Sequence, residues 1–515
     1  MKDVELAALL QAQRAQPDPR LIDEAFASGQ MAQSVDTARA VNRMAVRFAV
    51  GDSALALKVR QRQDLSDRRQ QLDHDLYRRI GQRDAVAQAD IARLRTALRK
   101  ADDDLKRLDG EIAKAYPAYA ELVATRPVTI AEVQALLGPS EAVASLVVDR
   151  AATYLWIVTP KRVLFRALKV GSDELDAIVA RLREGLDLSR SPDIASAKFD
   201  IRLAYKLYRA LFAEAAPALA GVDHLIVIAS GALQSLPPAV LVTADPSAAK
   251  GDYRAVHWLI DQTAISVLPS VQTLASLRRL PRGERAVTAF LGIGDPVLGT
   301  PAAASRDTTR ALLARSLPPL PETADELRTI ATELGSGADN VLLRERATKR
   351  QIATMDLAKY RVIAFATHGL MAGDFKGLAE PALVLTPGAG ASDDGLLTAS
   401  DITRLRVNAD LVVLSACNTA APDGRPGAEG FSGLAKAFFY AGSRALLVSH
   451  WPVASEAAIR LTTGTIGQMA SAHVGPAEGL RRAMRALRDD RGDELFAYPG
   501  IWAPFVVVGE GGLER

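Results

Sequence analysis

The sequence predicts an α/β sandwich with a mostly parallel β-sheet, preceded by an all-α region. Two patterns predict it. Up to about residue 125, apolar residues recur three and four apart, which is typical of helices. Beyond it, short runs of Val, Leu, Ile and Ala alternate with helical stretches, as expected for parallel strands buried on both faces. We therefore divide the 515-residue chain into a helical region, residues 1–125, and an α/β domain, residues 126–515.

The helical region contains a predicted antiparallel coiled-coil hairpin. From Ile91 to Ile112, apolar residues alternate at spacings of three and four, which makes an a/d seam. A weaker seam runs from Leu65 to Ile80, and the break at residues 81–84 lets the second arm fold back on the first. Charges of both signs cover the segment. It is therefore either a structural hairpin with a solvated face or a coiled coil that dimerises or binds a partner.

The α/β domain is expected to contain two sets of strands, one in residues 126–285 and one in 286–515. The first set comprises Ala142–Val148, Tyr154–Val158, Leu225–Ala229 and Ile265–Leu268. The second set comprises Val287–Ile293, Val341–Leu343, Val362–Ala366, Ala382–Leu385, Leu411–Leu414, Ala445–Val448 and Pro504–Val508. Loops rich in Pro, Gly and Asp interrupt the second set at 317–323, 386–395 and 422–430. We treat the two sets as a front half and a second half of one domain.

Composition and charge exclude several classes of protein. The chain has 63 basic and 60 acidic residues, an imbalance too small to indicate a nucleic-acid partner. No run approaches the roughly 18 apolar residues needed to span a bilayer, and the N-terminus lacks the basic start and apolar stretch of a signal peptide. One cysteine excludes an internal disulfide, and the six histidines lack metal-binding spacing. We expect a cytoplasmic protein with no membrane partner, no metal and no cofactor.

Two of the predicted strands lead to reactive residues. Strand 362–366 is followed by His368 and Gly369, and strand 411–414 is followed by Cys417. Because the carboxyl ends of neighbouring parallel strands meet at one edge of a sheet, the imidazole and the thiol are expected to face one crevice. An imidazole favours the thiolate and can protonate a leaving amine, as cysteine-based acyl transfer requires. Either residue alone is more often structural, so the functional interpretation depends on their joint occurrence.

The motifs around these residues resemble those of the CHAT domain, which belongs to the caspase, separase and gingipain group of peptidases. In the second half they are ATHG at 366–369, LSACNTA at 414–420, GFSGLAKAFFYAG at 430–442, SHWPV at 449–453 and WAPFVVVG at 502–509. In the front half they are IASGALQSLPPAVL at 228–241, LPS at 268–270 and GIGDP at 292–296. The resemblance covers roughly residues 130–510. It implies a caspase-like three-layer α/β/α sandwich, with a pseudo-peptidase-like front half and a peptidase half.

The resemblance assigns roles to the reactive residues. It implies that His368 is the general base and Cys417 the nucleophile of a cysteine peptidase. The backbone N–H groups of Gly369 and Cys417 would then face the developing oxyanion, where such donors are typically worth ~3 kcal/mol each. The segment 418–430 follows the nucleophile and is a candidate gate, and Arg425 in it is a candidate cleavage point.

The resemblance also indicates how a substrate binds. Ser449, His450 and Trp451 follow the next strand, where relatives of the caspase group pair with the substrate as an added β-strand. Trp451 fits a pocket wall and a buried core indole about equally well, and His450 is a rival general base. Ser415, also expected to contact the substrate, occupies the position that is acidic in metacaspases. Cleavage then follows an uncharged residue, or a loop acid recognises charge. The candidate loop acids are Asp374, Asp393 and Asp394.

The function expected from these observations is cleavage of a specific protein substrate by a cysteine endopeptidase. The resemblance further implies a bacterial origin and low activity until a partner or a cleavage event releases it. Residues 1–125 show no tetratricopeptide signature, so the regulatory input is not indicated by a repeat. The resemblance implies a regulatory protein partner that binds through this N-terminal helical region. Two alternatives stay open at this point: a catalytically inactive scaffold that binds a peptide in the same groove, and an adaptor that acts through the hairpin.

Overall fold

The computed structural model describes most of the chain from residue 127 onwards and parts of the segment before it. The described residues are 19–32, single positions between 58 and 76, 85–115, 127–188, 198–279, 286–298, 314, 316–372, 374, 378, 380–388, 393–415 and 433–512. They fall into two compact units. The hairpin unit holds the described residues between 58 and 115, and the large unit holds all the others. The expected boundary at residue 125 stays a prediction, although residues 19–32 belong to the large unit.

The hairpin unit contains one long helix and an earlier arm that runs antiparallel to it. Helix α5 (Ala85–Ala115) buries its apolar stripe, which comprises Ile91, Leu98, Ala101, Leu108 and Ile112. Ion pairs join the two arms: Lys58 lies 2.6 Å from Glu111, and Arg69 lies 3.1 Å from Asp102. Later residues of the first arm pair with earlier residues of α5, so the two arms run in opposite directions. Whether they form a coiled coil stays a prediction.

The large unit is built on one broad β-sheet. In the described part of the chain its strand order is β3-β2-β1-β4-β5-β14-β13-β12-β8-β6-β7. The strands of the front half are β1 Glu141–Val148, β2 Thr153–Val158, β3 Val163–Leu168, β4 His224–Ala229 and β5 Ala264–Val267. The strands of the second half are β6 Thr288–Pro296, β7 Val341–Arg344, β8 Tyr360–Ala366, β12 Leu411–Ser415, β13 Ala445–Ser449 and β14 Phe505–Gly509. A small antiparallel sheet contains β9 Gly369–Leu370, β10 Ala382–Val384 and β11 Leu396–Thr398.

The strand pairing confirms the mostly parallel sheet that the sequence predicts. The pairs β1–β2, β2–β3 and β13–β14 are antiparallel, and the other neighbouring strands are parallel. In the second half the chain starts at β6, moves outward to β7 and then returns to the other side of β6 as β8. Such a reversal of strand order marks the place where open α/β sheets bind ligands, beyond the carboxyl ends of the strands.

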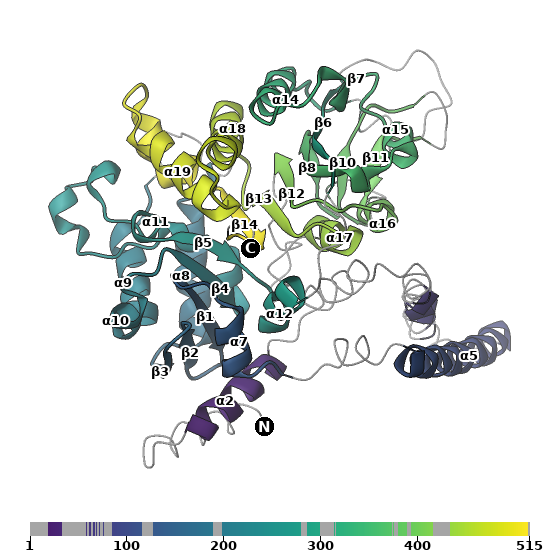
Figure 1. Cartoon of the computed structure of the whole chain (residues 1–515), viewed down its shortest axis with the longest axis horizontal. Helices are drawn as coiled ribbons and strands as arrows, with labels where there is room; N and C mark the ends of the chain where they lie inside the picture. Colours follow the sequence, from purple (N-terminus) through teal and green to yellow (C-terminus); the bar gives the residue numbers. More distant parts are fainter. Residues whose placement is uncertain are drawn as a thin grey trace. The chain divides into compact units, whose positions relative to one another are not determined.

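Helices cover both faces of the sheet. They are α2 Pro19–Ala32, α7 Ile130–Leu136, α8 Ser172–Glu184, α9 Ile201–Phe212, α10 Ala216–Leu219, α11 Leu259–Gln262, α12 Val271–Arg279, α14 Glu322–Glu333, α15 Lys349–Thr354, α16 Ala399–Thr403, α17 Gly433–Ala441, α18 Ser455–Ala472, α19 Pro476–Asp489 and α20 Pro499–Trp502. Figure 1 shows α14, α18 and α19 on one face and α12 and α17 on the other. Side chains alternate along β8: Ala364 and Ala366 pack in the core with α14, whereas Phe365 contacts Phe438 of α17. The three-layer α/β/α sandwich is therefore confirmed.

Strand β14 joins the two halves of the sheet. It pairs in parallel with β5 of the front half and antiparallel with β13 of the second half. A buried arginine ties the same region together: Arg278 of α12 binds Glu141 of β1 and Glu510, which follows β14, at 2.6–2.9 Å. Burial would raise the pKa of both carboxyl groups, but hydrogen bonds hold each pKa below its usual value: His224 and Arg278 act on Glu141, and Arg278 acts on Glu510.

Candidate active site

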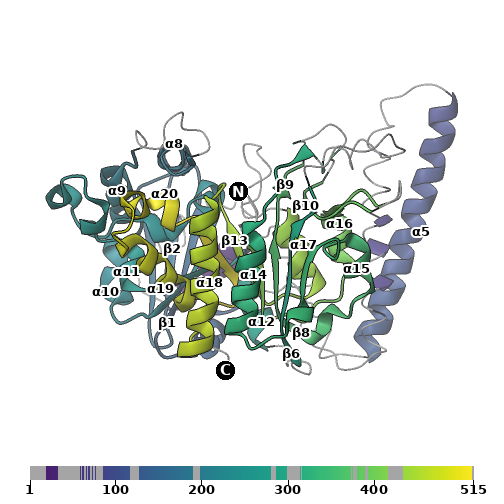
Figure 2. The same ribbon diagram turned by 90° about the horizontal axis from the view of Figure 1, so that it is seen from above.

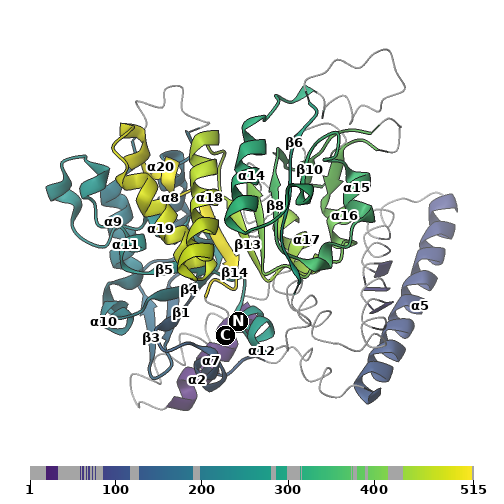
Figure 3. The ribbon, with the colours of Figure 1, turned by 45° about the horizontal axis from the view of Figure 1, so that its top comes forward.

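A cavity of about 90 Å³ opens at the carboxyl ends of β8 and β12 in the second half. Its walls come from α14, from the ends of these two strands and from the first turns of α18; Figures 2 and 3 show the two helices side by side. The polar lining residues are Glu322, Thr323, Glu326, Thr367, His368, Ser415 and Ser455. We call it the His368 cavity. It lies beside the reversal of strand order between β6 and β8, where the topology predicts a ligand site.

The tip of β8 fixes the orientation of His368. The backbone carbonyl of His368 accepts a hydrogen bond from the N–H of Val384 at 2.9 Å, which ties the end of β8 to β10. Its ring atom Nε2 lies 2.9 Å from the carbonyl oxygen of Pro318. A carbonyl oxygen can only accept, so Nε2 carries the proton in this bond and Nδ1 is the unprotonated ring nitrogen. The half-buried imidazole therefore offers Nδ1 as a base at the cavity.

The register of β8 and β12 relates the two reactive positions. These strands pair in parallel, with Ala366 opposite Ser415. His368 comes two residues after Ala366, and Cys417 comes two residues after Ser415. Cys417 itself lies outside the described residues, as do the proposed gate at 418–430 and Arg425.

Gly369, the predicted oxyanion residue, begins the short strand β9. It stands opposite Leu383 of β10 in the small antiparallel sheet. This pairing holds the chain immediately after His368 in an extended conformation. The assignment of its backbone N–H, and that of Cys417, to an oxyanion site stays a prediction.

Ser415 contacts a buried acid that the sequence analysis missed. The hydroxyl of Ser415 donates to Oε2 of Glu326 at 3.2 Å, and the hydroxyl of Thr462 donates to Oε1 of the same carboxyl at 2.7 Å. Glu326 is only 1% exposed. Burial raises its pKa to about 7, the two hydroxyl donors oppose the rise, and the nearby carboxylate of Glu322 adds to it. Ser415, the uncharged residue two positions before Cys417, is thus hydrogen-bonded to a carboxyl group from helix α14.

A sequence signal for Glu326 was present. In α14 the buried residues are Thr323, Ala324, Glu326, Leu327, Ile330 and Ala331. Glu326 therefore stands on the apolar stripe of an amphipathic helix, where charged residues are rare unless they have a partner or a function.

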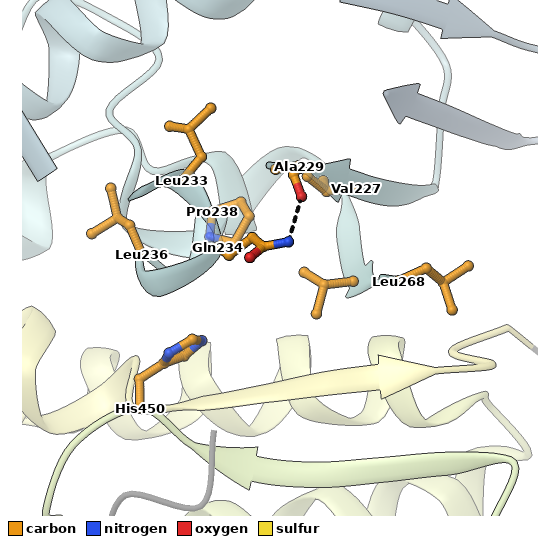
Figure 4. A pocket seen from close by; sticks show the side chains of 9 residues that line it. Val227, Ala229, Leu233, Gln234, Leu236, Pro238, Leu268 and His450 are labelled. Atoms are coloured by element: carbon orange, nitrogen blue, oxygen red, sulfur yellow. Dashed lines mark hydrogen bonds between the residues drawn. The ribbon is translucent and has the colours of Figure 1, made fainter. Parts of the chain in front are cut away.

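His450 lies in a different cavity, which Figure 4 shows. This His450 cavity measures about 20 Å³ and is formed mainly by apolar residues at the ends of β4 and β5. They include Val227, Ala229, Leu233, Leu236, Pro238 and Leu268. The imidazole is 2% exposed, and its Nδ1 has no hydrogen-bond partner among the described residues. Burial, with the charge of Arg183, lowers its pKa to about 3. The imidazole of His450 is therefore a weak base and lies in a different cavity from His368, which does not favour His450 as the general base.

The main chain of His450 is also engaged. Its N–H donates to the carbonyl oxygen of Pro504 at 2.8 Å, and its carbonyl accepts from Arg183 at 3.1 Å. Ser449 and Trp451 are fully buried, and the indole of Trp451 donates to the carbonyl of Gly500 at 2.8 Å. These side chains expose no surface to a peptide. A role of this segment in substrate binding would therefore depend on its remaining main-chain groups, and it stays a prediction.

The three loop acids take part in local turns. Asp374 accepts the backbone N–H of Met371 at 2.7 Å, and Asp394 accepts that of Leu396 at 3.0 Å. The backbone carbonyl of Asp393 accepts from the N–H of Gly388 at 3.1 Å. Such contacts are the ordinary role of aspartate in loops. Among the described residues that line the His368 cavity, the acids are Glu322 and Glu326.

Metal and membrane sites can be judged only within the described ranges. There, no group of three or more His, Cys, Asp or Glu side chains is arranged to hold a metal ion. In the same part of the chain, no helix has both the length and the apolar composition needed to cross a bilayer.

Comparison with protein families identifies the large unit. Residues 202–510 match the CHAT domain, which is more than half of the 515-residue chain. The chain belongs to the CHAT domain family. This confirms the resemblance inferred from the motifs. The CHAT match begins in α9, so β1, β2 and β3 precede it, and it includes both the His450 cavity and the His368 cavity.

Curated relatives of this CHAT protein include Tetratricopeptide repeat protein 28 of Mus musculus and of Homo sapiens. The mouse protein is 26% identical over 325 residues and the human protein 25% identical over the same length. Each alignment covers 56% of this chain but only 12% of the relative. The chain therefore spans a small part of the curated relatives that it matches.

Solved structures similar to this CHAT protein include two complexes. The Saccharomyces cerevisiae separase-securin complex aligns with a TM-score of 0.45 and 9% identity, covering 73% of this chain and 30% of that one. The complex of the pro- and mature domains of RgpB from Porphyromonas gingivalis aligns with a TM-score of 0.35 and 12% identity, covering 66% and 76%.

Proposed function

We propose that this CHAT protein is a cysteine endopeptidase in which Cys417 is the nucleophile and Nδ1 of His368 is the general base. The register of β8 and β12 carries the proposal. Ala366 stands opposite Ser415 in two parallel neighbouring strands, and each reactive residue comes two positions later in the sequence. Strands in a sheet are about 4.8 Å apart, a spacing from which a thiol and an imidazole can reach each other.

The bond between His368 and Pro318 supports the assignment of the base. It keeps the proton on Nε2, so Nδ1 can take the proton of the Cys417 thiol. The thiolate then attacks the carbonyl carbon of the substrate and forms the C–S bond. As the C–N bond breaks, the imidazolium returns its proton to the leaving amine. Water hydrolyses the thioester with His368 again as base, which releases the new carboxylate and restores the thiol.

The proposal includes an oxyanion site on the main chain. The N–H groups of Gly369 and Cys417 stabilise the negative charge that develops on the substrate carbonyl oxygen. Backbone donors suit this purpose because they are fixed before the reaction and need no reorganisation. The pairing of Gly369 with β10 supports this role, since it fixes the chain at that point.

We propose a specific protein substrate and a regulatory protein partner. The partner would bind the hairpin unit, where α5 exposes the basic side chains of Arg95, Arg99 and Lys106. The finer expectations of a bacterial origin, and of activation by a partner or by cleavage, are part of the proposal and depend on the family resemblance.

Cleavage by active-site variants tests the proposal. Purified full-length protein would be incubated with a peptide library, and cleavage would be followed by mass spectrometry. We expect Cys417→Ala and His368→Gln to lose at least ~10³-fold in kcat/KM. The matched control is His257→Gln, since His257 is an exposed histidine that does not line the His368 cavity. Equal cleavage by wild type and Cys417→Ala would overturn the peptidase proposal and favour a peptide-binding scaffold or an adaptor.

A further inference from the structure

We propose that the His368 cavity binds a long, positively charged substrate side chain, that of the residue before the cleaved bond, and that Glu326 is the acid that recognises it. This inference deepens the proposed function and rests on it. The substrates would be proteins cut after Arg or Lys. The recognition acid would come from α14, not from the three loop acids considered above.

The position of Glu326 ties it to the reactive strand end. Its carboxyl group receives the hydroxyl of Ser415, the last residue of β12, two positions before Cys417 in the sequence. Glu326 is also one of the residues that line the cavity with His368. An acid in this place can hold the end of a side chain whose own carbonyl carbon is being attacked.

Glu326 has spare capacity to accept hydrogen bonds. Thr462 donates to one of its oxygens and Ser415 to the other. An ionised carboxylate has about four acceptor sites, so two donors leave room for a guanidinium or an ammonium group. The two hydroxyl donors hold the carboxyl group in one orientation before any ligand arrives.

No lysine or arginine among the described lining residues balances the charge of Glu326. Apart from His368, the described residues lining the cavity carry no cationic side chain, and Glu322 adds a second acid, held at 2.8 Å by the hydroxyl of Ser455. Glu141 and Glu510 provide the contrast, since Arg278 lies between these buried acids. Burying a carboxylate without a cation is costly, and a basic ligand would remove that cost.

The remaining walls of the cavity suit the aliphatic part of the same side chain. The apolar lining residues are Leu320, Val453, Ala458, Ile459 and Phe505. Lysine and arginine combine methylene groups with a charged end, so they match a cavity that has apolar walls and an acid. A short acidic or polar side chain would match neither feature.

Binding to an inactive protein tests the inference without requiring catalysis. The probes are two tetrapeptide amides that differ only in the last residue, arginine or norleucine, measured by calorimetry against full-length Cys417→Ala. We expect the arginine peptide to bind at least ~30-fold more tightly, and the added change Glu326→Gln to remove most of that difference. Equal affinities of the two peptides, or no binding of the arginine peptide, would overturn the inference.

Two further variants control this experiment. Glu333→Gln makes the same change on the same helix at an exposed position outside the cavity, and it should keep the preference for arginine. Glu326→Asp keeps the charge but shortens its reach, so it should retain part of the preference. If Glu326→Gln fails to fold, as judged by thermal unfolding, the graded loss in Glu326→Asp still decides.

Peptide cleavage separates this inference from the proposed function. We expect wild type to cut after Arg and Lys, and Glu326→Gln to lower the ratio of kcat/KM for arginine over norleucine substrates by at least ~30-fold. Cleavage mainly after uncharged residues would overturn the inference and leave the peptidase proposal intact. Tight binding of the arginine peptide without any cleavage would do the reverse.

Discussion

The two cavities at the carboxyl edge of the sheet differ in what fills them. The His450 cavity, at the ends of β4 and β5, is closed by leucine and proline side chains and measures about 20 Å³. The His368 cavity, at the ends of β8 and β12, measures about 90 Å³ and keeps two acids and an imidazole on its walls. Both occupy the place where α/β sheets bind ligands. The topology of the sheet therefore creates two possible ligand-binding places, and the side chains that line each cavity determine whether a ligand can bind there.

Replacing each of the two histidines by glutamine tests this contrast, and it has the largest expected effect. His368→Gln should lower kcat/KM for a peptide substrate by at least ~10³-fold, because Nδ1 is lost as a base. His450→Gln should keep kcat/KM within about threefold of wild type and cost about 1 kcal/mol of unfolding free energy. Steady-state kinetics and urea unfolding measure both. A larger kinetic loss in His450→Gln would reverse the assignment of the two cavities.

The buried acid should reduce stability at neutral and alkaline pH. The pKa of Glu326 is about 7 in the folded protein against an ordinary value of 4.5, so its contribution is favourable only below pH 4.5 and is lost as the pH rises through 7. We expect Glu326→Gln to raise the unfolding free energy by up to ~3 kcal/mol at pH 8 and by little at pH 4.5. Urea unfolding at the two pH values measures this. The same difference at both would contradict it.

The preference for a basic substrate should depend on pH. A cation favours ionised Glu326, so the arginine-over-norleucine ratio should fall up to about tenfold for each pH unit below 7 and level off above it. Glu322 and His368 are the other ionisable groups among the described residues that line the cavity, whereas Ser455 of α18 and Ser415 of β12 are uncharged. In Glu326→Gln the ratio should lose the part of this dependence that Glu326 causes. An unchanged profile would assign it to the other two groups.

A small effect is expected in the His450 cavity. Gln234 donates to the carbonyl of Ala229 at 2.9 Å, at the end of β4, as Figure 4 shows. Gln234→Leu should lower the unfolding free energy by about 1 kcal/mol and leave the cleavage preference unchanged. Thermal unfolding together with peptide profiling checks both. A changed preference would indicate that the front half takes part in substrate recognition.

Most of the sheet could be predicted from the sequence, because its strands are continuous apolar runs. The predicted strands 362–366 and 411–414 agree with β8 and β12 to within two residues. The edge strand β3 was missed, since it is partly exposed and carries Arg166. A strand with one face in water does not form a continuous apolar run, so a search for such runs does not find it.

The acid of the His368 cavity could not be placed from the sequence. Glu326 and Thr462 are 136 positions apart, and they meet only because α14 packs against α18. The sequence shows only that Ser415 is uncharged, because the residues around it do not reveal the Glu326 carboxyl group to which its hydroxyl is hydrogen-bonded. The burial of Trp451 could not be predicted for the same reason. A motif specifies residue types and their order, whereas long-range packing determines which way a side chain points.

The central place of β14 has a consequence for synthesis and folding. Residues 505–509 fill the gap between β5 and β13, so during translation neither half of the sheet can be completed until they emerge. Until then β5 and β13 each present an open edge, which is a site for aggregation. Contacts between residues so distant in the sequence also slow folding. We therefore expect nascent chains to need protection at these two edges, and separately expressed halves to be prone to association.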